Sequence, residues 1–244
     1  MTFVTGGDPS VSHLASILEA LQEGGADVIE VGLPFSDPIA DGPVIQASSY
    51  RALSAGATRH GILHALQSAR LNVPVVLMGY YNTMLRPGLR AFAEEAKASG
   101  VAGTIVCDAI PEEAAEWVEL SRGLGLDTIF LAAPTSTPAR LDAVAAQSSG
   151  FVYAVSRTGV TGAALTQEDQ TLRLVNDLKA RTPTPVCVGF GVSTPAQVRS
   201  MAAVADGVVV GSSLVTLVHE QWEDGSGRAD VVDYVRTLKA ATRG

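Results

Sequence analysis

The chain is organised around the stretch Asp27-Val-Ile-Glu-Val-Gly-Leu-Pro-Phe-Ser-Asp-Pro-Ile-Ala-Asp-Gly-Pro43. Its apolar run 28–33 has the β-branched density of a strand that is buried on both faces, and Glu30 lies inside that run. Burial disfavours the charged form of a carboxyl group and raises its pKa, so Glu30 would be suited to proton exchange near neutral pH. The alternative interpretation is a structural ion pair with a distant Arg or Lys, and the run alone does not decide between the two.

Beyond this strand, three prolines stiffen a loop that carries two further carboxylates, Asp37 and Asp41. The Asp41-Gly42 pair permits a tight turn, and we expect one of the two aspartates to cap or brace the loop. A calcium-binding EF-hand is excluded, because its loop needs acidic residues at alternate positions and a glutamate further on.

Outward from this stretch, strand-like apolar runs alternate with amphipathic helical segments. Eight strands at a spacing of about thirty residues suit right-handed βαβ units and predict an α/β fold, a single (β/α)8 TIM barrel over residues 1–244. A doubly wound open sheet is the alternative, but Gly6-Gly-Asp-Pro9 stands where its G-x-G-x-x-G fingerprint would follow the first strand. The predicted strands cover residues 2–5, 26–32, 73–79, 102–107, 127–132, 151–155, 185–189 and 207–210. The predicted helices cover residues 10–23, parts of 43–70, 88–99, 112–123, 138–147, 168–181, 194–202 and the chain after the last strand.

The composition excludes several classes of protein. The 25 acidic and 17 basic residues give a net charge of -8, and no basic run occurs, which disfavours binding to nucleic acid or to an anionic membrane. No apolar stretch approaches the roughly 18 residues of a membrane span, and the first residues lack the basic region and cleavage site of a signal peptide. We therefore expect a cytoplasmic protein.

The cysteines and histidines do not form a metal motif. Cys107 and Cys187 have neither a CxxC nor a metal-ligand spacing, and we expect both to be buried free thiols. His60 and His64 lie four residues apart on a predicted helix, but the glutamate of HExxH is missing, so a solvated helix face is expected.

The last two predicted strands end in Gly189-Phe-Gly191 and Gly211-Ser-Ser213, each of which opens a helix. Glycine lets backbone N–H groups approach an anion closely, and the helix N-terminus adds the positive end of its dipole. Each glycine alone could serve only as a turn, and Ser212 only as an N-cap. Two such loops at consecutive late strands, with Thr161-Gly162 arriving from the sixth strand, predict a phosphate site.

Four segments together resemble the α subunit of tryptophan synthase, and the resemblance runs in the same order from residue 3 to the last helix. It implies a carbon–carbon lyase of tryptophan biosynthesis that cleaves indole-3-glycerol phosphate to indole and glyceraldehyde 3-phosphate without a cofactor or a metal. It also implies a pyridoxal-phosphate-bearing β subunit as partner, in an α2β2 heterotetramer. The segments are Glu30-Val-Gly-Leu-Pro-Phe-Ser-Asp-Pro-Ile-Ala-Asp-Gly-Pro43, Ser156-Arg-Thr-Gly-Val-Thr-Gly162, Gly189-Phe-Gly191 and Gly211-Ser212.

The resemblance further implies the roles of individual residues. Glu30 corresponds to the catalytic acid/base, Asp41 to the carboxylate that faces the indole N–H, and Tyr153 to an active-site tyrosine. Thr161 matches a threonine that closes against Asp41. The positions at or near the indole pocket are Phe3, Tyr80, Ile105, Leu131 and Phe190, and the phosphate ligands are Gly162, Gly191, Gly211 and Ser212.

The chain departs from the family pattern in three places. The family usually has an extra helix before the first strand, covering the bottom of the barrel, whereas here the strand follows Met1 directly. The segment Asp108-Ala-Ile-Pro111 has its proline one position later than usual, in a loop that faces the β subunit in the family. Residues 163–165 lack a basic residue that is common there.

Two other hypotheses stand beside the lyase. Another barrel enzyme for phosphorylated sugars, such as a ribulose-phosphate epimerase or an indole-glycerol-phosphate synthase, could share the phosphate site. It would need metal ligands or a lysine acid, and the predicted strand ends offer neither a His pair nor a Lys. A catalytically silent subunit that only activates a partner is the third hypothesis, against which the presence of Glu30 and Asp41 argues.

Overall fold

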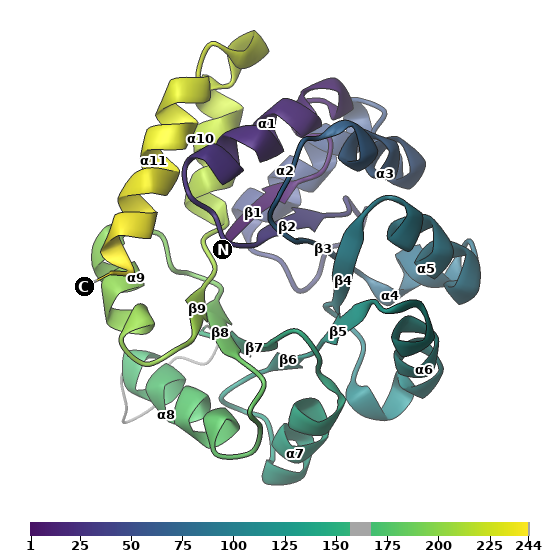
Figure 1. Ribbon diagram of the computed structural model, residues 1–244, viewed down its shortest axis with the longest axis vertical. Helices are drawn as coiled ribbons and strands as arrows, with labels where there is room; N and C mark the ends of the chain where they lie inside the picture. Colours follow the sequence, from purple (N-terminus) through teal and green to yellow (C-terminus); the bar gives the residue numbers. More distant parts are fainter. Residues whose placement is uncertain (157–166, 244) are drawn as a thin grey trace.

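The computed structural model describes residues 1–156 and 167–243. Figure 1 looks into a ring of strands that is enclosed by a ring of helices. All the strand pairs are parallel, in the orders β1-β2-β3-β4-β5 and β6-β7-β8-β9. The strands are β1 (Thr2–Thr5), β2 (Ile29–Gly32), β3 (Val75–Gly79), β4 (Val101–Val106), β5 (Asp127–Ile129), β6 (Leu131–Ala132), β7 (Val152–Val155), β8 (Val186–Gly189) and β9 (Gly207–Val208).

The two sets of strands join into one closed barrel. β5 and β6 are separated only by Phe130, whose carbonyl accepts a hydrogen bond from the Tyr153 N–H at 3.1 Å. At the other seam, the Phe3 N–H donates to the Val210 carbonyl at 2.9 Å, and Thr2 pairs with Val210 in a parallel bridge. The (β/α)8 barrel expected from the alternation of segments is therefore confirmed, whereas a doubly wound sheet would have kept two unpaired edges.

The helices cover the outside of the ring. They are α1 (Val11–Glu23), α2 (Pro43–Ser54), α3 (Arg59–Ser68), α4 (Tyr81–Leu85), α5 (Leu89–Ala98), α6 (Ala115–Leu124), α7 (Pro138–Gln147), α8 (Gln167–Lys179), α9 (Pro195–Ala202), α10 (Ser212–Gln221) and α11 (Arg228–Ala241), with the 3-10 turns η1 (Pro111–Glu113) and η2 (Glu223–Gly225).

Several predicted bounds were wrong, for local reasons. β2 begins at Ile29 rather than at residue 26, because the Ala26 N–H still bonds to the Leu21 carbonyl and completes the end of α1. The helix expected from residue 112 starts at Ala115, since Pro111–Glu113 forms a separate turn. The helix α4 was not predicted, and it occupies a segment that we expected to be a loop.

Buried apolar side chains form an outer layer between strands and helices and an inner layer within the barrel. Successive side chains of a strand point to opposite faces. Ile29 and Val31 belong to the outer layer, so Glu30 between them points into the barrel. The inner layer consists of Phe3, Val76, Met78, Ile105, Ile129, Phe151, Tyr153, Cys187, Val209 and Val215.

Helix α2 is anchored to the end of β1. The hydroxyl oxygens of Thr5 and Ser48 lie 2.6 Å apart, and the buried Asp8 carboxylate accepts two hydrogen bonds from Arg51 at 3.0 and 2.6 Å. Asp8, which follows the first strand, is thus occupied in fixing α2. This anchoring holds the helix that follows the loop of Asp41.

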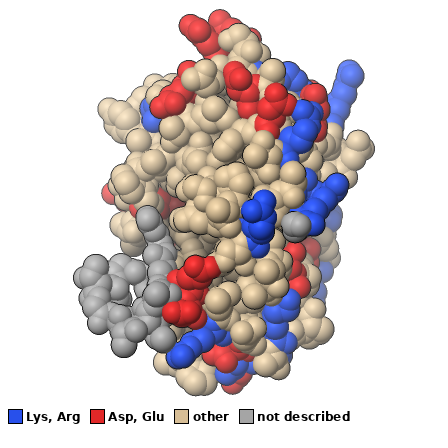
Figure 2. All heavy atoms as spheres, turned by 90° about the vertical axis from the view of Figure 1, so that its left-hand side faces the viewer, with Lys and Arg blue, Asp and Glu red and all other residues tan. Residues whose placement is uncertain are grey.

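One face of the molecule carries groups of acidic and groups of basic side chains. Figure 2 shows both signs distributed over the face that includes α9 and α11, without a continuous basic field. None of the helices in the described residues is long and apolar enough to cross a membrane.

Candidate active site

Glu30 is buried at the centre of the barrel, with a relative exposure of 0%. In the parallel register its neighbours are Phe3 on β1 and Val76 on β3, both members of the inner apolar layer. Neither carboxyl oxygen has a hydrogen-bond partner, and no ion pair to Glu30 occurs among residues 1–156 and 167–243. Burial raises the pKa of Glu30 to about 8. The alternative of a structural ion pair therefore finds no partner in the described part of the chain.

Asp41 lies at the end of the loop that follows β2. The Tyr80 hydroxyl donates a hydrogen bond to Asp41 Oδ2 at 2.9 Å and accepts one from the Ala40 N–H at 3.0 Å. Burial raises the pKa of Asp41, and the hydrogen bond from Tyr80 partly opposes that rise. Asp37 is exposed and accepts a hydrogen bond from Ser36. Of the two loop aspartates, Asp41 is thus the one that braces the loop against the barrel.

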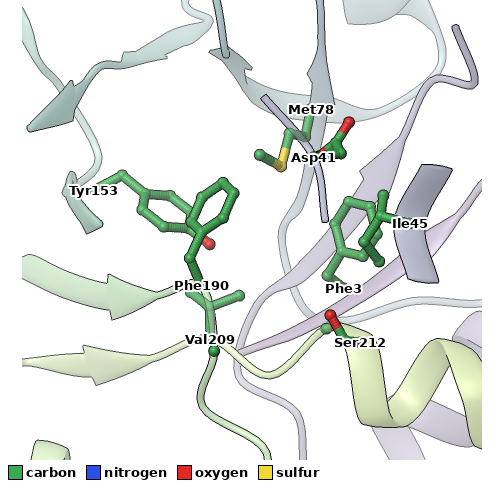
Figure 3. Close-up of a pocket in the computed structure, with 10 residues that line it drawn as sticks. Phe3, Asp41, Ile45, Met78, Tyr153, Phe190, Val209 and Ser212 are labelled. Atoms are coloured by element: carbon green, nitrogen blue, oxygen red, sulfur yellow. The ribbon is translucent and has the colours of Figure 1, made fainter. Parts of the chain in front are cut away.

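A cavity opens at the carboxyl ends of the strands, with about 370 Å³ of empty space including its mouth. Figure 3 shows Tyr153 and Phe190 on one side of it and Phe3 and Ile45 on the other. Two apolar walls facing each other suit a flat aromatic ring. The lining residues are Phe3, Asp41, Ile45, Met78, Tyr153, Phe190, Gly191, Val209, Gly211 and Ser212.

The Tyr153 side chain is an uncharged part of this wall. Its ring packs edge-on against that of Phe190, with centroids 5.5 Å apart. Burial raises the pKa of Tyr153 well above its ordinary value, so the phenol stays protonated at neutral pH. Glu30 is consequently better suited than Tyr153 to exchange protons near pH 7 to 8.

One end of the cavity is formed by backbone. After β8, Phe190 and Gly191 adopt positive φ values of 66° and 93°, and Gly211 is the N-cap of α10. Gly191, Gly211 and Ser212 line the cavity together, so the predicted phosphate ligands from the seventh and eighth strands lie side by side. The free N–H groups at the start of α10 and the helix dipole favour an anion at this end.

Tyr234 on α11 connects the two glycine loops, and no feature of the local sequence predicts this contact. Its hydroxyl bonds to the Ser193 carbonyl at 3.0 Å and to Ser213 Oγ at 2.7 Å. α11 therefore ties the segment after β8 to the start of α10.

Other predicted residues lie around the cavity rather than in its wall. Ile105 is fully buried in the inner layer, and the half-buried Leu131 packs against that layer. Tyr80 lines a smaller adjoining hollow that shares Phe3 and Asp41 with the main cavity. Thr161 and Gly162 lie outside the described residues.

Three lining residues were missed by the sequence analysis. Met78 lies two positions after Val76 on β3, so strand alternation could have placed it inside the barrel. Val209 follows β9, and Ile45 lies in the first turn of α2. Alternation along the predicted strand 207–210 could likewise have placed Val209, whereas nothing in the local sequence of Ile45 indicates that it approaches the cavity.

The cysteines and histidines are only partly as expected. Cys187 is a buried free thiol, but Cys107 is half-buried, because it lies beyond the end of β4 at the barrel mouth. His60 is exposed and bonds to Glu95 on α5. The described residues contain no group of three or more His, Cys, Asp and Glu side chains that could hold a metal ion.

The fold and the site together define a class of protein: a (β/α)8-barrel enzyme whose cavity lies at the carboxyl ends of its strands, with a buried glutamic acid of raised pKa inside the barrel.

Comparison with known proteins narrows this class to a family. The family model described as tryptophan synthase alpha chain matches residues 1–243. The tryptophan synthase alpha chain of Geobacter sulfurreducens is 48% identical over 243 residues, which cover 99% of this chain and 92% of the relative. The chain belongs to the tryptophan synthase alpha chain family, and it is a lyase of tryptophan biosynthesis.

Solved structures agree with the assignment. A Mycobacterium tuberculosis tryptophan synthase chain superposes with a TM-score of 0.90 at 41% identity, covering 100% of this chain and 91% of that chain. A chain of the Pyrococcus furiosus tryptophan synthase a2b2 complex gives a TM-score of 0.88 at 38% identity, covering 98% and 96%.

Proposed function

We propose that this chain cleaves indole-3-glycerol phosphate to indole and glyceraldehyde 3-phosphate by a retro-aldol reaction in which Glu30 carries the proton. The observation that supports this role most directly is the burial of an unpaired Glu30 with a pKa of about 8, in register with Phe3, which lines the cavity. A carboxyl group with this pKa is available as an acid at neutral pH and as a base once it has given up its proton.

The shape of the cavity supports one orientation of the substrate, with the indole ring between the apolar walls and the phosphate at the glycine-lined end. The indole ring would lie between the walls formed by Tyr153 and Phe190 and by Phe3 and Ile45. The phosphate would bind at the opposite end, against the N–H groups of Gly191, Gly211 and Ser212, with Gly162 as a further ligand. Ile105 and Leu131 would close the indole pocket from the inner layer.

In the first step, neutral Glu30 would protonate the indole ring carbon that bears the side chain. The ring becomes a cation, and the ionised Asp41 would stabilise it by accepting the indole N–H. Because Asp41 is half-buried, this charge interaction would be stronger than one in open water.

In the second step, the Glu30 carboxylate would take the proton of the side-chain hydroxyl on the carbon next to the ring. The bond between that carbon and the ring breaks, its electron pair returns to the ring, and the hydroxyl oxygen becomes the aldehyde carbonyl. Glu30 is again protonated and the ring is neutral, so no cofactor or outside proton donor is needed.

The partner would be a tryptophan synthase β subunit, which takes up the indole. The similarity to a chain of the Pyrococcus furiosus tryptophan synthase a2b2 complex supports this assembly. The structure of that complex is described as the structural basis of its mutual activation. Thr161 would then close against Asp41, and the partner would favour the closed state. The reaction would take place in the cytoplasm, where tryptophan is made.

Release of indole from indole-3-glycerol phosphate tests the proposal, measured with the chain alone and with a β subunit. Indole release without a partner, increased by the β subunit, is the expected result. Stimulation of the partner without any indole release would identify a silent subunit instead, and an epimerase or a synthase would release no indole under either condition.

A further inference from the structure

Tyr80 is a buried tyrosine at the barrel mouth, held by contacts of both its backbone and its side chain. It follows β3 directly and precedes α4, and its relative exposure is 3%. Its carbonyl accepts hydrogen bonds from the Thr83 hydroxyl at 2.6 Å and from the Thr83 N–H at 2.9 Å. The residue is thus fixed at its backbone before its side chain makes any contact with the loop of Asp41.

The Tyr80 side chain holds that loop at three points. Its ring stacks on Phe35, with centroids 5.0 Å apart and an interplanar angle of 26°. Its hydroxyl binds the Ala40 N–H at 3.0 Å and Asp41 Oδ2 at 2.9 Å. Together these contacts attach both the start and the end of the loop 34–42 to the end of β3.

The direction of the hydroxyl proton follows from these partners. The Ala40 N–H can only donate, so the Tyr80 oxygen accepts from it, and the single hydroxyl hydrogen is left for Asp41. A carboxylate accepts such a bond better than a carboxylic acid does. Tyr80 therefore orients Asp41 and favours its ionised form.

We propose that Tyr80 is a positioning residue for the reaction: by binding Oδ2 of Asp41 it directs the other carboxylate oxygen to the indole N–H. This inference rests on the proposed function of Asp41. It gives Tyr80 a second role beside its place near the indole pocket: Tyr80 affects the reaction by orienting the Asp41 carboxylate.

Among residues 1–156 and 167–243, the side-chain donor bonded to Asp41 is the Tyr80 hydroxyl. Cys107 at the end of β4 and Tyr153 on β7 face Asp41, and burial raises the pKa of both, so both stay neutral in the range of the test. Glu30 lies deeper, on β2, and titrates near pH 8. Arg51 on α2 is bound to Asp8, and Asp37 on the same loop is exposed. Within the described part of the chain, no cation is paired with Asp41.

The test is Tyr80→Phe, which removes the hydroxyl and keeps the ring that stacks on Phe35. We expect kcat to fall about tenfold to a hundredfold, with KM within about threefold of the parent, because binding contacts remain and only stabilisation of the charged intermediate is lost. The acid limb of kcat/KM should move to higher pH, because Asp41 loses the donor that lowers its pKa. Tyr81→Phe, at the neighbouring half-buried position, is the matched control and should leave the rate and the limb unchanged.

The double variant Tyr80→Phe with Asp41→Asn separates this inference from the proposed function. If Tyr80 acts through Asp41, its removal should add nothing, within about twofold, to the loss caused by Asp41→Asn alone. Additive losses, or an acid limb that stays in place in Tyr80→Phe, would overturn the role of Tyr80 while leaving that of Asp41 intact. A fully active Asp41→Asn protein would instead overturn the proposed role of Asp41 itself.

Discussion

Phe3 on β1 and Glu30 on β2 are partners in the parallel register, so their side chains point to the same side of the sheet, into the barrel. Phe3 lines the cavity at the barrel mouth, whereas Glu30 lies fully buried beside it. This relationship places a carboxyl group of raised pKa on the strand next to a residue that lines the proposed indole site.

Burial of Glu30 should make the fold less stable as the pH rises. The folded-state pKa of about 8 lies above the ordinary value of 4.5, so between these values the folded state binds a proton that the unfolded state has lost. Stability contributed by this group is therefore complete below pH 4.5 and is lost as the pH rises towards 8 and beyond. Glu30→Gln should melt at a higher temperature than the parent at pH 9, with a smaller difference at pH 5. Equal differences at both pH values would show that Glu30 does not titrate in this range.

The raised pKa of Glu30 also predicts how kcat/KM falls at alkaline pH. If neutral Glu30 begins the reaction, kcat/KM should decline above about pH 8, one power of ten per pH unit. The limb is measured with the chain alone at substrate concentrations far below KM. A constant rate up to pH 10 would mean that the acid form of Glu30 is not required.

Asp41→Asn should slow cleavage by at least about a hundredfold and leave the phosphate affinity unchanged. The substitution removes charge only where the cationic intermediate develops, and the phosphate end of the cavity is formed by other residues. Asp37→Asn, in the same loop but exposed, is the control and should retain parental turnover. Loss of glycerol 3-phosphate binding in Asp41→Asn would point to a structural role for this residue.

Gly211→Asp should weaken the binding of glycerol 3-phosphate by at least about tenfold, because it sets a carboxylate against the anion. Gly211→Ala is the matched control, because it adds a side chain at this position without adding the negative charge of Gly211→Asp. A Cβ at this position would be 3.4 Å from Phe3, an ordinary contact at its close limit, and the φ of -121° suits any residue. Titration calorimetry should show near-parental affinity for the Ala variant. Equal affinities of the Asp and Ala variants would mean that no phosphate binds at the start of α10.

The barrel could be predicted because the pattern that specifies it, alternating strand and helix segments, can be recognised within short stretches of sequence. Alternating strand and helix segments fix βαβ units, and the glycines after the seventh and eighth strands lie at ends that a barrel brings together. The interruption at Phe130 and the seam between Phe3 and Val210 depend on strand register around the whole ring, which no local segment encodes.

Contacts between side chains of different loops could not be predicted either, because no local segment of sequence encodes them. The bond from Tyr80 to Asp41 joins residues 39 positions apart, and it depends on where the loop folds back over β3. Ile45 likewise reaches the cavity only through the packing of α2. The roles implied for Thr161 and Gly162 stay predictions, since both lie outside the described residues.

The most direct test of the central claim is the rate of indole formation from saturating indole-3-glycerol phosphate by Glu30→Gln, compared with the parent. Glutamine keeps the shape of the side chain and removes the exchangeable proton, so turnover should fall by about a hundredfold or more while the substrate still binds. Turnover within threefold of the parent would contradict the account, because the proton would then have to travel by a route that does not include Glu30.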